Sequence, residues 1–213
     1  SPLAAKTNAD GTFVGSSVDF LHEGWRIGAS IVWDSSKAVT KRTLYDGGNS
    51  SGHYKLHSLT LDGHVGYRFD MGQGGWRLAP QIGVTHIAVK RGGLTETGGS
   101  PFALEVAQRR TKATFLDADL ELAINGDASV RPWLSAGWQH RLDGNAVLAT
   151  AGFTGASGQF TANGAERTRD FAHIGAGVEW SVSKKLDLYA RGGSAFGSGT
   201  GVRSLTIGLR YGF

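Results

Sequence analysis

The segment Leu205-Thr206-Ile207-Gly208-Leu209-Arg210-Tyr211-Gly212-Phe213 decides the fold. Its odd-numbered positions carry apolar or aromatic side chains, and its even-numbered positions carry small or polar ones. Successive side chains of a β-strand point to opposite faces of the sheet. The segment therefore predicts a strand with one apolar face and one polar face, and its last residue is aromatic.

The same alternation recurs along the chain, for example over 59–69, 116–124 and 174–182, where the polar positions include full charges. No helical periodicity accompanies it, so the predicted fold class is all-β. We expect strands over 12–21, 25–34, 56–69, 76–89, 107–124, 130–142, 168–183, 185–197 and 203–213. Each has roughly 10 or more residues, as a tilted strand needs to cross a bilayer. Strands in soluble proteins average about 5–6 residues.

The connections between these strands alternate in length. Short turns are expected at 22–24, 70–75, 125–129 and 183–184, and longer or glycine-rich connections at 35–55, 90–106, 143–167 and 198–202. An alternative is that further strands lie within 1–11, 35–55 or 143–166, the last of which has room for an extracellular hairpin. Short turns on one side and long loops on the other are typical of bacterial outer-membrane proteins. The sequence thus predicts an antiparallel up-and-down transmembrane β-barrel of which about 9–10 strands are visible.

The composition removes several classes of function. The chain has 213 residues, 33 of them glycine, and no cysteine, so disulfides, cysteine-based zinc sites and cysteine nucleophiles are excluded. The net charge of +4 comes from scattered basic residues, which argues against a nucleic-acid partner. No apolar run is long enough for a transmembrane helix.

Aromatic side chains gather near the expected short turns and the last strand. At one height they would form the periplasmic interfacial girdle of a barrel, whereas the alternative is ordinary core packing. The girdle residues are Phe20, Trp25, Phe69, Trp76, Trp133 and Trp180, together with Tyr211 and Phe213.

Charged residues occupy the opposite face of the expected strands. Burying so many ions in a dry core would be costly, so we expect a hydrated lumen in which acids and bases form cross-strand pairs. These lumen charges are Asp62, Arg68, Arg77, Asp117, Asp119, Glu121, Arg131, Glu179, Asp187, Arg191 and Arg210.

The terminal pattern Leu205, Ile207, Leu209, Tyr211 and Phe213 resembles the assembly signal of bacterial outer-membrane barrels. The resemblance implies recognition by the barrel-assembly machinery. In physical terms, an unpaired edge strand can pair with the edge of another barrel before closure.

More of the chain resembles the β-domain of autotransporters, the type V secretion systems of Gram-negative bacteria. The resembling segments, in order over about 12–213, are 59–69, 76–81, 130–140, 167–180 and 205–213. The resemblance implies a 12-stranded barrel in the cell outer membrane that anchors a passenger domain and helps to export it, with a helix in the pore. Neither helix nor passenger is recognisable here. We therefore expect residues 1–213 to be a barrel domain without its N-terminal strands, linker helix and passenger.

No catalytic, cofactor or metal site is predicted. Asp117, Asp119 and Glu121 share a face at about 6.7 Å steps, a spacing that any charged lumen offers. His53 and His57 would lie about 13 Å apart in a strand, too far to share one ion.

The expected partners are outer-membrane lipid and lipopolysaccharide, the barrel-assembly machinery and the protein's own passenger. Two alternatives stay open. One is a stand-alone outer-membrane barrel acting as a small pore, or as an adhesin through 35–55 and 143–167. The other is a soluble β-barrel that binds an apolar ligand, with its apolar face inside.

Overall fold

The computed structural model describes residues 5–44, 46–72, 75–98, 101–124, 128–143, 148–164, 168–197 and 200–212. Every regular element in these ranges is a β-strand. No helix that could cross a membrane occurs among them.

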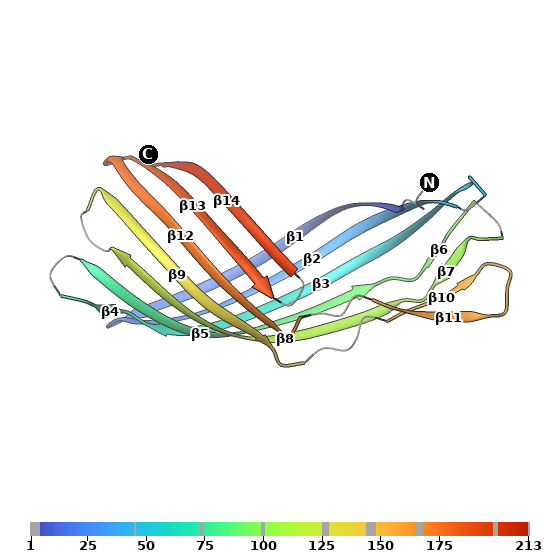
Figure 1. Cartoon of the computed structure of the whole chain (residues 1–213), viewed down its shortest axis with the longest axis horizontal. Coiled ribbons are helices and arrows are strands. Elements are labelled where there is room, and N and C mark those ends of the chain that lie inside the picture. Colours follow the sequence, from blue (N-terminus) through green and yellow to red (C-terminus); the bar gives the residue numbers. More distant parts are fainter. Residues whose placement is uncertain are drawn as a thin grey trace.

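Nine long strands form one antiparallel sheet, and each strand pairs with the next long strand along the chain (Figure 1). A two-residue strand, β4 (Phe69–Asp70), also pairs with β5. The long strands in sheet order are β1 (Ala5–His22), β2 (Trp25–Thr43), β3 (Asn49–Tyr67), β5 (Trp76–Arg91), β8 (Arg109–Ile124), β9 (Val130–Arg141), β12 (Asp170–Ser183), β13 (Leu186–Gly197) and β14 (Thr200–Tyr211).

The nine predicted strands are all present, so the predicted fold class is confirmed. The expected long connection over 35–55 was wrong and the alternative of missed strand there holds, because β2 continues to Thr43 and β3 begins at Asn49 in unbroken register. Both faces of this extension carry polar side chains. Sequence alternation therefore could not detect it, although backbone pairing sustains it.

A second sheet of four short strands lies beside the β2–β3 extension. Its order is β11 (Gln159–Asn163), β10 (Leu148–Phe153), β7 (Leu104–Val106) and β6 (Leu94–Thr95). The expected hairpin within 143–167 is the β10–β11 pair. A backbone bridge between Ser51 and Thr97 connects this sheet to β3.

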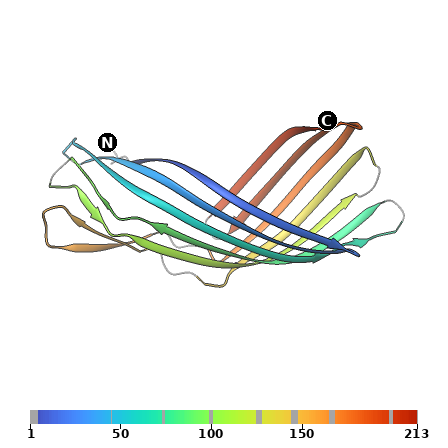
Figure 2. The ribbon, with the colours of Figure 1, turned by 180° about the vertical axis from the view of Figure 1, so that it is seen from behind.

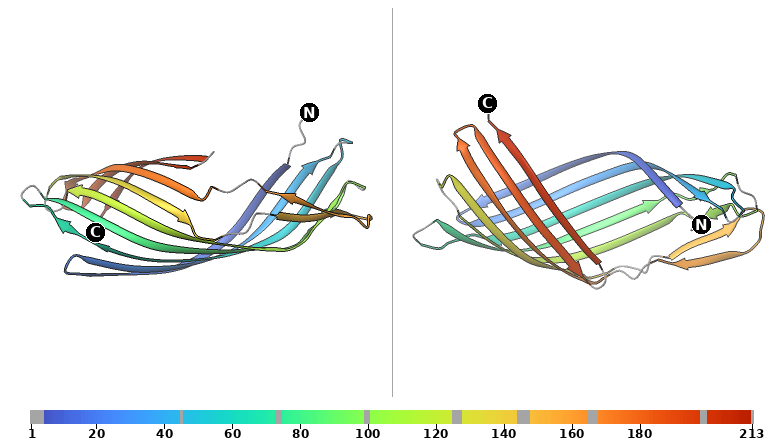
Figure 3. Two further views of the ribbon diagram at one scale, coloured as in Figure 1. Left: turned by 60° about the horizontal axis from the view of Figure 1, so that its bottom comes forward. Right: turned by 45° about the horizontal axis from the view of Figure 1, so that its top comes forward.

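The main sheet is curled into a half-barrel, seen from behind in Figure 2 and tilted in Figure 3. The strands β1 and β14 form its two edges, and each pairs with one neighbour among the described residues. Residues 5–22 of β1 are exposed throughout.

The strand register separates the side chains into two faces. One row of directly paired residues runs Ile27, Val65, Ile82, Ala118 and Trp138, and the next row runs Gly28, His64, Gly83, Asp117 and Gln139. The first belongs to an apolar face and the second to a polar face.

Large apolar side chains are exposed instead of buried. Leu205 and Ile207 are 77% and 76% exposed, whereas the buried apolar side chains of the described residues are mostly alanines. An apolar surface of this extent on the outside of the curl requires a nonpolar surrounding. The soluble alternative needs this surface inside, so it is wrong.

The β1–β2 turn shows how the short connections close. Glu23 and Gly24 have φ values of 47° and 88°. Two consecutive left-handed residues match the twist of a two-residue hairpin, and glycine adopts this conformation without strain.

The two faces of β14 predict different responses to the same substitution. Ile207→Arg should destabilise the complete protein by about 2–4 kcal/mol, because a guanidinium on the apolar face would lie in the hydrocarbon near mid-depth. Thr206→Arg should cost much less, because Thr206 pairs with Arg191 on the polar face. Unfolding in lipid vesicles with denaturant measures both, and equal losses would contradict the assignment of faces.

Candidate functional site

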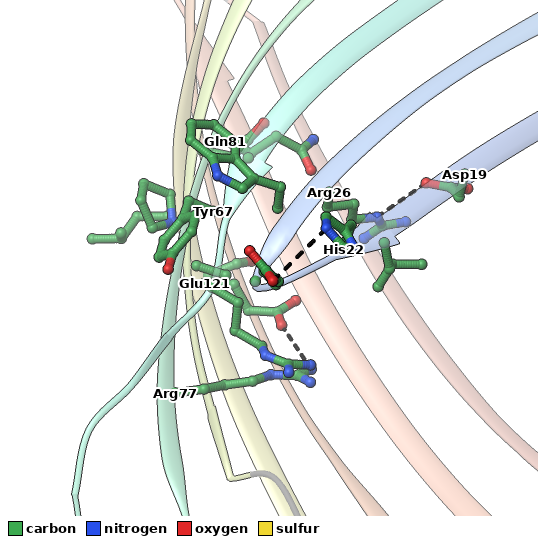
Figure 4. A pocket seen from close by; sticks show the side chains of 18 residues that line it. Asp19, His22, Arg26, Tyr67, Arg77, Gln81 and Glu121 are labelled. Carbon is green, nitrogen blue, oxygen red and sulfur yellow. Dashed lines mark hydrogen bonds and ion pairs between the residues drawn. The ribbon is translucent and has the colours of Figure 1, made fainter.

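The polar face forms the inside of the curl. Near the short-turn end it lines a cavity of about 700 Å³ (Figure 4). Polar-face side chains around this cavity include Asp19, Arg26, Arg68, Arg77, Gln81, Asp119, Glu121 and Ser135. A concave wall of this kind can hold water and polar chain segments, which an apolar core cannot.

The register places ten of the eleven predicted lumen charges on this polar face, and the eleventh, Arg68, lies between β3 and β4 and lines the cavity. The expected cross-strand ion pairs are present. Arg77 on β5 lies 3.2 Å from a carboxylate oxygen of Glu121 on β8. Acids and bases on neighbouring strands therefore neutralise one another across the wall.

The largest group of these charges joins four strands at the short-turn end. Arg131 lies 3.4 Å from Glu179 and 3.8 Å from Asp187, and its Nη1 donates to Ser181. Arg210 on β14 donates to Glu179 at 3.0 Å. We call these five residues the arginine cluster; they connect β9, β12, β13 and β14.

A second group lies further along the wall. Its members Asp62 and Asp117 were predicted, whereas Asp19, His64 and Thr85 were missed by sequence reasoning. The His64 ring lies 3.3 Å from both Asp19 and Asp62, and Thr85 bridges Asp62 to Asp117. The inward position of His64 follows from the period-2 pattern of its own strand, because it lies two residues after Asp62. The same pattern, followed from Glu179 back along β12, places His173 on this face.

His173 makes a related pair on the same face. Its Nε2 lies 2.7 Å from Asp119, and Gly137 lies between the two strands that carry them. Gln139 donates to Asp117 at 2.6 Å. Asp62, Asp117 and Asp119 are thus held by histidine, threonine and amide groups, whereas Asp19 also accepts a hydrogen bond from Arg26 at 3.0 Å.

The structure corrects the prediction for Trp133. This residue shares the polar face with Arg131, so it does not belong to a lipid-facing girdle. Its indole lies over Gly177, where a Cβ atom would be 2.6 Å from the ring. The prediction used distance from the turn and ignored the parity that Trp133 shares with Arg131.

The other predicted girdle residues lie on the apolar face at the short-turn end. Their exposed fractions are 58% for Phe20, 50% for Trp25, Phe69 and Trp180, and 37% for Trp76. The Tyr67 ring packs edge-on against Trp25 and Phe69, with centroids 5.1 and 4.7 Å apart. Of the terminal signature, Leu205, Ile207, Leu209 and Tyr211 are exposed on β14, and Phe213 lies outside the described residues.

The opposite end of the wall is held by a buried ion pair. Glu96, 7% exposed, accepts hydrogen bonds from Arg42 at 2.7 Å and from the Leu104 N–H at 2.9 Å. Burial alone would raise the pKa of Glu96, but the Arg42 and Leu104 hydrogen bonds outweigh it and hold the pKa below its ordinary value. The second sheet is thereby fixed to the β2–β3 extension.

The acidic residues with a possible chemical role are engaged in the wall. Asp117, Asp119 and Glu121 contact Gln139, His173 and Arg77, respectively. Both His53 and His57 lie in β3 on its outward side. Within the part of the chain that the structure describes, no group of three or more His, Asp or Glu side chains could hold a metal ion.

The arginine cluster should stabilise the sheet measurably. Arg131→Ala would leave Glu179 and Asp187 facing each other with weaker compensation, at a cost of about 1–3 kcal/mol. Arg191→Ala is the matched control, because the Arg191 guanidinium lies 5.9 Å from the Tyr189 ring on the same face. Denaturant unfolding in detergent measures both variants, and an Arg131→Ala loss no larger than that of the control would contradict the role of the cluster.

Solved structures similar to this chain are translocator barrels. The translocator domain of autotransporter NalP from Neisseria meningitidis matches with a TM-score of 0.76 and 15% identity, over 98% of this chain and 68% of that one. The β-domain of the Bordetella autotransporter BrkA matches with a TM-score of 0.64 and 19% identity, over 97% and 75%. At these identities the likeness shows a shared fold. No curated protein matches the sequence.

The family itself is shown by the sequence. The family model described as the autotransporter β-domain matches residues 2–193. This match agrees with the curled sheet, its apolar outer face and its charged inner wall. The chain therefore belongs to the autotransporter β-domain family and is an outer-membrane translocator domain for a passenger domain.

Proposed function

We propose that the apolar face contacts outer-membrane lipid and that the polar face lines a water-filled lumen through which the passenger segment passes. The opposite character of the two faces carries this proposal. Ten of the predicted lumen charges share the inner face, while Leu205 and Ile207 are more than three-quarters exposed on the outer face. Lipid would cover Leu205, Ile207 and the rest of the outer face, and water would solvate the charged side chains of the inner face.

The short-turn end is the periplasmic end in this proposal. Trp25, Phe69, Trp76 and Trp180 lie there on the apolar face, as interfacial aromatics do. The β2–β3 extension and the second sheet then stand outside the cell. The outer leaflet, lipopolysaccharide included, would surround the wall below them.

The open edges of the sheet require partners. The backbone groups along the outer sides of β1 and β14 cannot stay unpaired in hydrocarbon. We infer that further strands preceding β1 complete the barrel, with a linker helix and the passenger before them. The terminal strand, with its apolar positions Leu205, Ile207 and Leu209, would be the segment that the barrel-assembly machinery recognises.

The role of the domain is transport and anchoring, without a reaction of its own. The acidic side chains of the wall are paired with bases and amides across strands, as a structural lining requires. The stand-alone barrel is less well supported, because the matching family consists of translocator domains.

Single cysteines test the proposed orientation, because the chain contains none. In intact cells that make the complete protein, a membrane-impermeant thiol reagent should label Lys41→Cys on the β2–β3 extension. It should label Lys185→Cys, in the β12–β13 turn, only after the outer membrane is permeabilised. The reverse pattern would contradict the orientation, and equal labelling of both in intact cells would contradict membrane insertion.

A further inference from the structure

A group of basic side chains lies on the outward face beyond the apolar surface. The group consists of Lys37 on β2, Lys55 on β3, Lys90 on β5, and Arg110 and Lys112 on β8. We call it the outer basic patch. All five residues are exposed, and the transport role described above uses none of them.

The register brings like charges together in this patch. Lys37 lies directly opposite Lys55, and Lys90 lies directly opposite Arg110. Like charges in directly opposed positions destabilise an antiparallel sheet. An arrangement with this cost calls for a compensating anion.

Carboxylates of the described residues supply little of that compensation. Asp10 lies opposite Lys37, Asp143 bonds to Thr114, and Glu105 lies on β7. Among the described residues, none of the five patch side chains forms an ion pair with them or with any other carboxylate. Asp10 can therefore compensate only Lys37. Among the described residues, no carboxylate lies directly opposite Lys90 or Arg110.

The five residues lie at nearly the same height above the short-turn end. Lys37 is twelve residues from Trp25, Lys55 twelve from Tyr67, and Lys112 twelve from Ile124. Lys90 and Arg110 are fourteen residues from Trp76 and Ile124. At about 3.3 Å per residue and a tilt of about 40°, this places the patch about 30–35 Å above the periplasmic interface.

This height lies just above the apolar band of a barrel, which is about 25 Å tall. Trp33, 45% exposed, lies below the patch, and its ring stacks with His57 at 6.3 Å. A tryptophan there matches the position of an interfacial aromatic. The patch therefore meets the layer in which the headgroups of the outer leaflet lie.

We propose that the outer basic patch binds the phosphate groups of lipopolysaccharide in the outer leaflet. The inference rests on the orientation proposed above, and it adds a defined lipid site on β2, β3, β5 and β8. Phosphates at this height would neutralise Lys55 and the opposed Lys90 and Arg110, none of which has a carboxylate of the described residues directly opposite it. Basic side chains near an anionic lipid surface each strengthen binding about fivefold.

Charge reversal in the outer basic patch, compared with charge reversal in the β12–β13 turn at the opposite end of the sheet, tests the site. The complete protein, folded in detergent, is titrated with fluorescent lipopolysaccharide for wild type, for Lys55→Glu/Lys90→Glu and for the matched control Lys184→Glu/Lys185→Glu. The two variants change the net charge equally, and heat-modifiable gel mobility verifies that each is folded. The patch variant should bind at least about tenfold more weakly, and the control should stay within about twofold of wild type.

Two further arms identify the ligand group. Lipopolysaccharide stripped of its lipid-anchor phosphates should bind wild type about tenfold more weakly, and phosphatidylglycerol at equal phosphate concentration should compete poorly. If Lys55→Gln/Lys90→Gln and the Glu variant both bind like wild type, the site is wrong. Equal binding of the stripped form, or full competition by phosphatidylglycerol, would also overturn the proposal. If the proposed orientation were wrong, the labelling of Lys41→Cys and Lys185→Cys would be reversed. That result is independent of lipopolysaccharide binding, so the two proposals can fail separately.

Discussion

The structure depends on one constraint: a strand that crosses a membrane must satisfy its backbone through neighbouring strands while its side chains alternate between lipid and water. Each long strand pairs with its sequence neighbour, so the backbone ladder is continuous from β1 to β14. Alternation then fixes the two faces at once, because a shift of one residue would carry the ion pairs of the wall into lipid. The apolar outer face and the charged inner wall are consequences of this single register.

The many glycines of the chain make the inner wall possible. Opposite His64, His173, Trp133 and Tyr189, the register places Gly28, Gly137, Gly177 and Gly208 on the same face. A Cβ atom at Gly28 or Gly177 would collide with the ring that lies over it. Large polar and aromatic side chains can therefore lie flat across neighbouring strands, as aromatic rings do over glycine in other sheets. At these four positions glycine provides room for a neighbouring side chain, whereas Gly24 serves a turn.

Sequence reasoning predicted the strands wherever one face meets lipid, because only there does apolar alternation persist. The β2–β3 extension was missed, since both of its faces are polar and its buried Arg42–Glu96 pair joins residues 54 apart. The period-2 alternation alone was enough to predict that the charged side chains of the wall point inward. Trp133 was misplaced by a rule of proximity to turns, and the His64 and His173 pairs needed the cross-strand register, which no single strand reveals.

The most direct test of the two-faced sheet is a nitroxide accessibility scan along β14 of the complete protein in lipid vesicles. One spin label at a time would be placed at each residue from Ser204 to Arg210, in a chain without native cysteine. Collision rates with oxygen should peak at Leu205, Ile207 and Leu209, and those with a water-soluble nickel chelate should peak at the positions between them. If both rates peak at the same positions, or show no period of two, the separation into a lipid face and a lumen face is wrong.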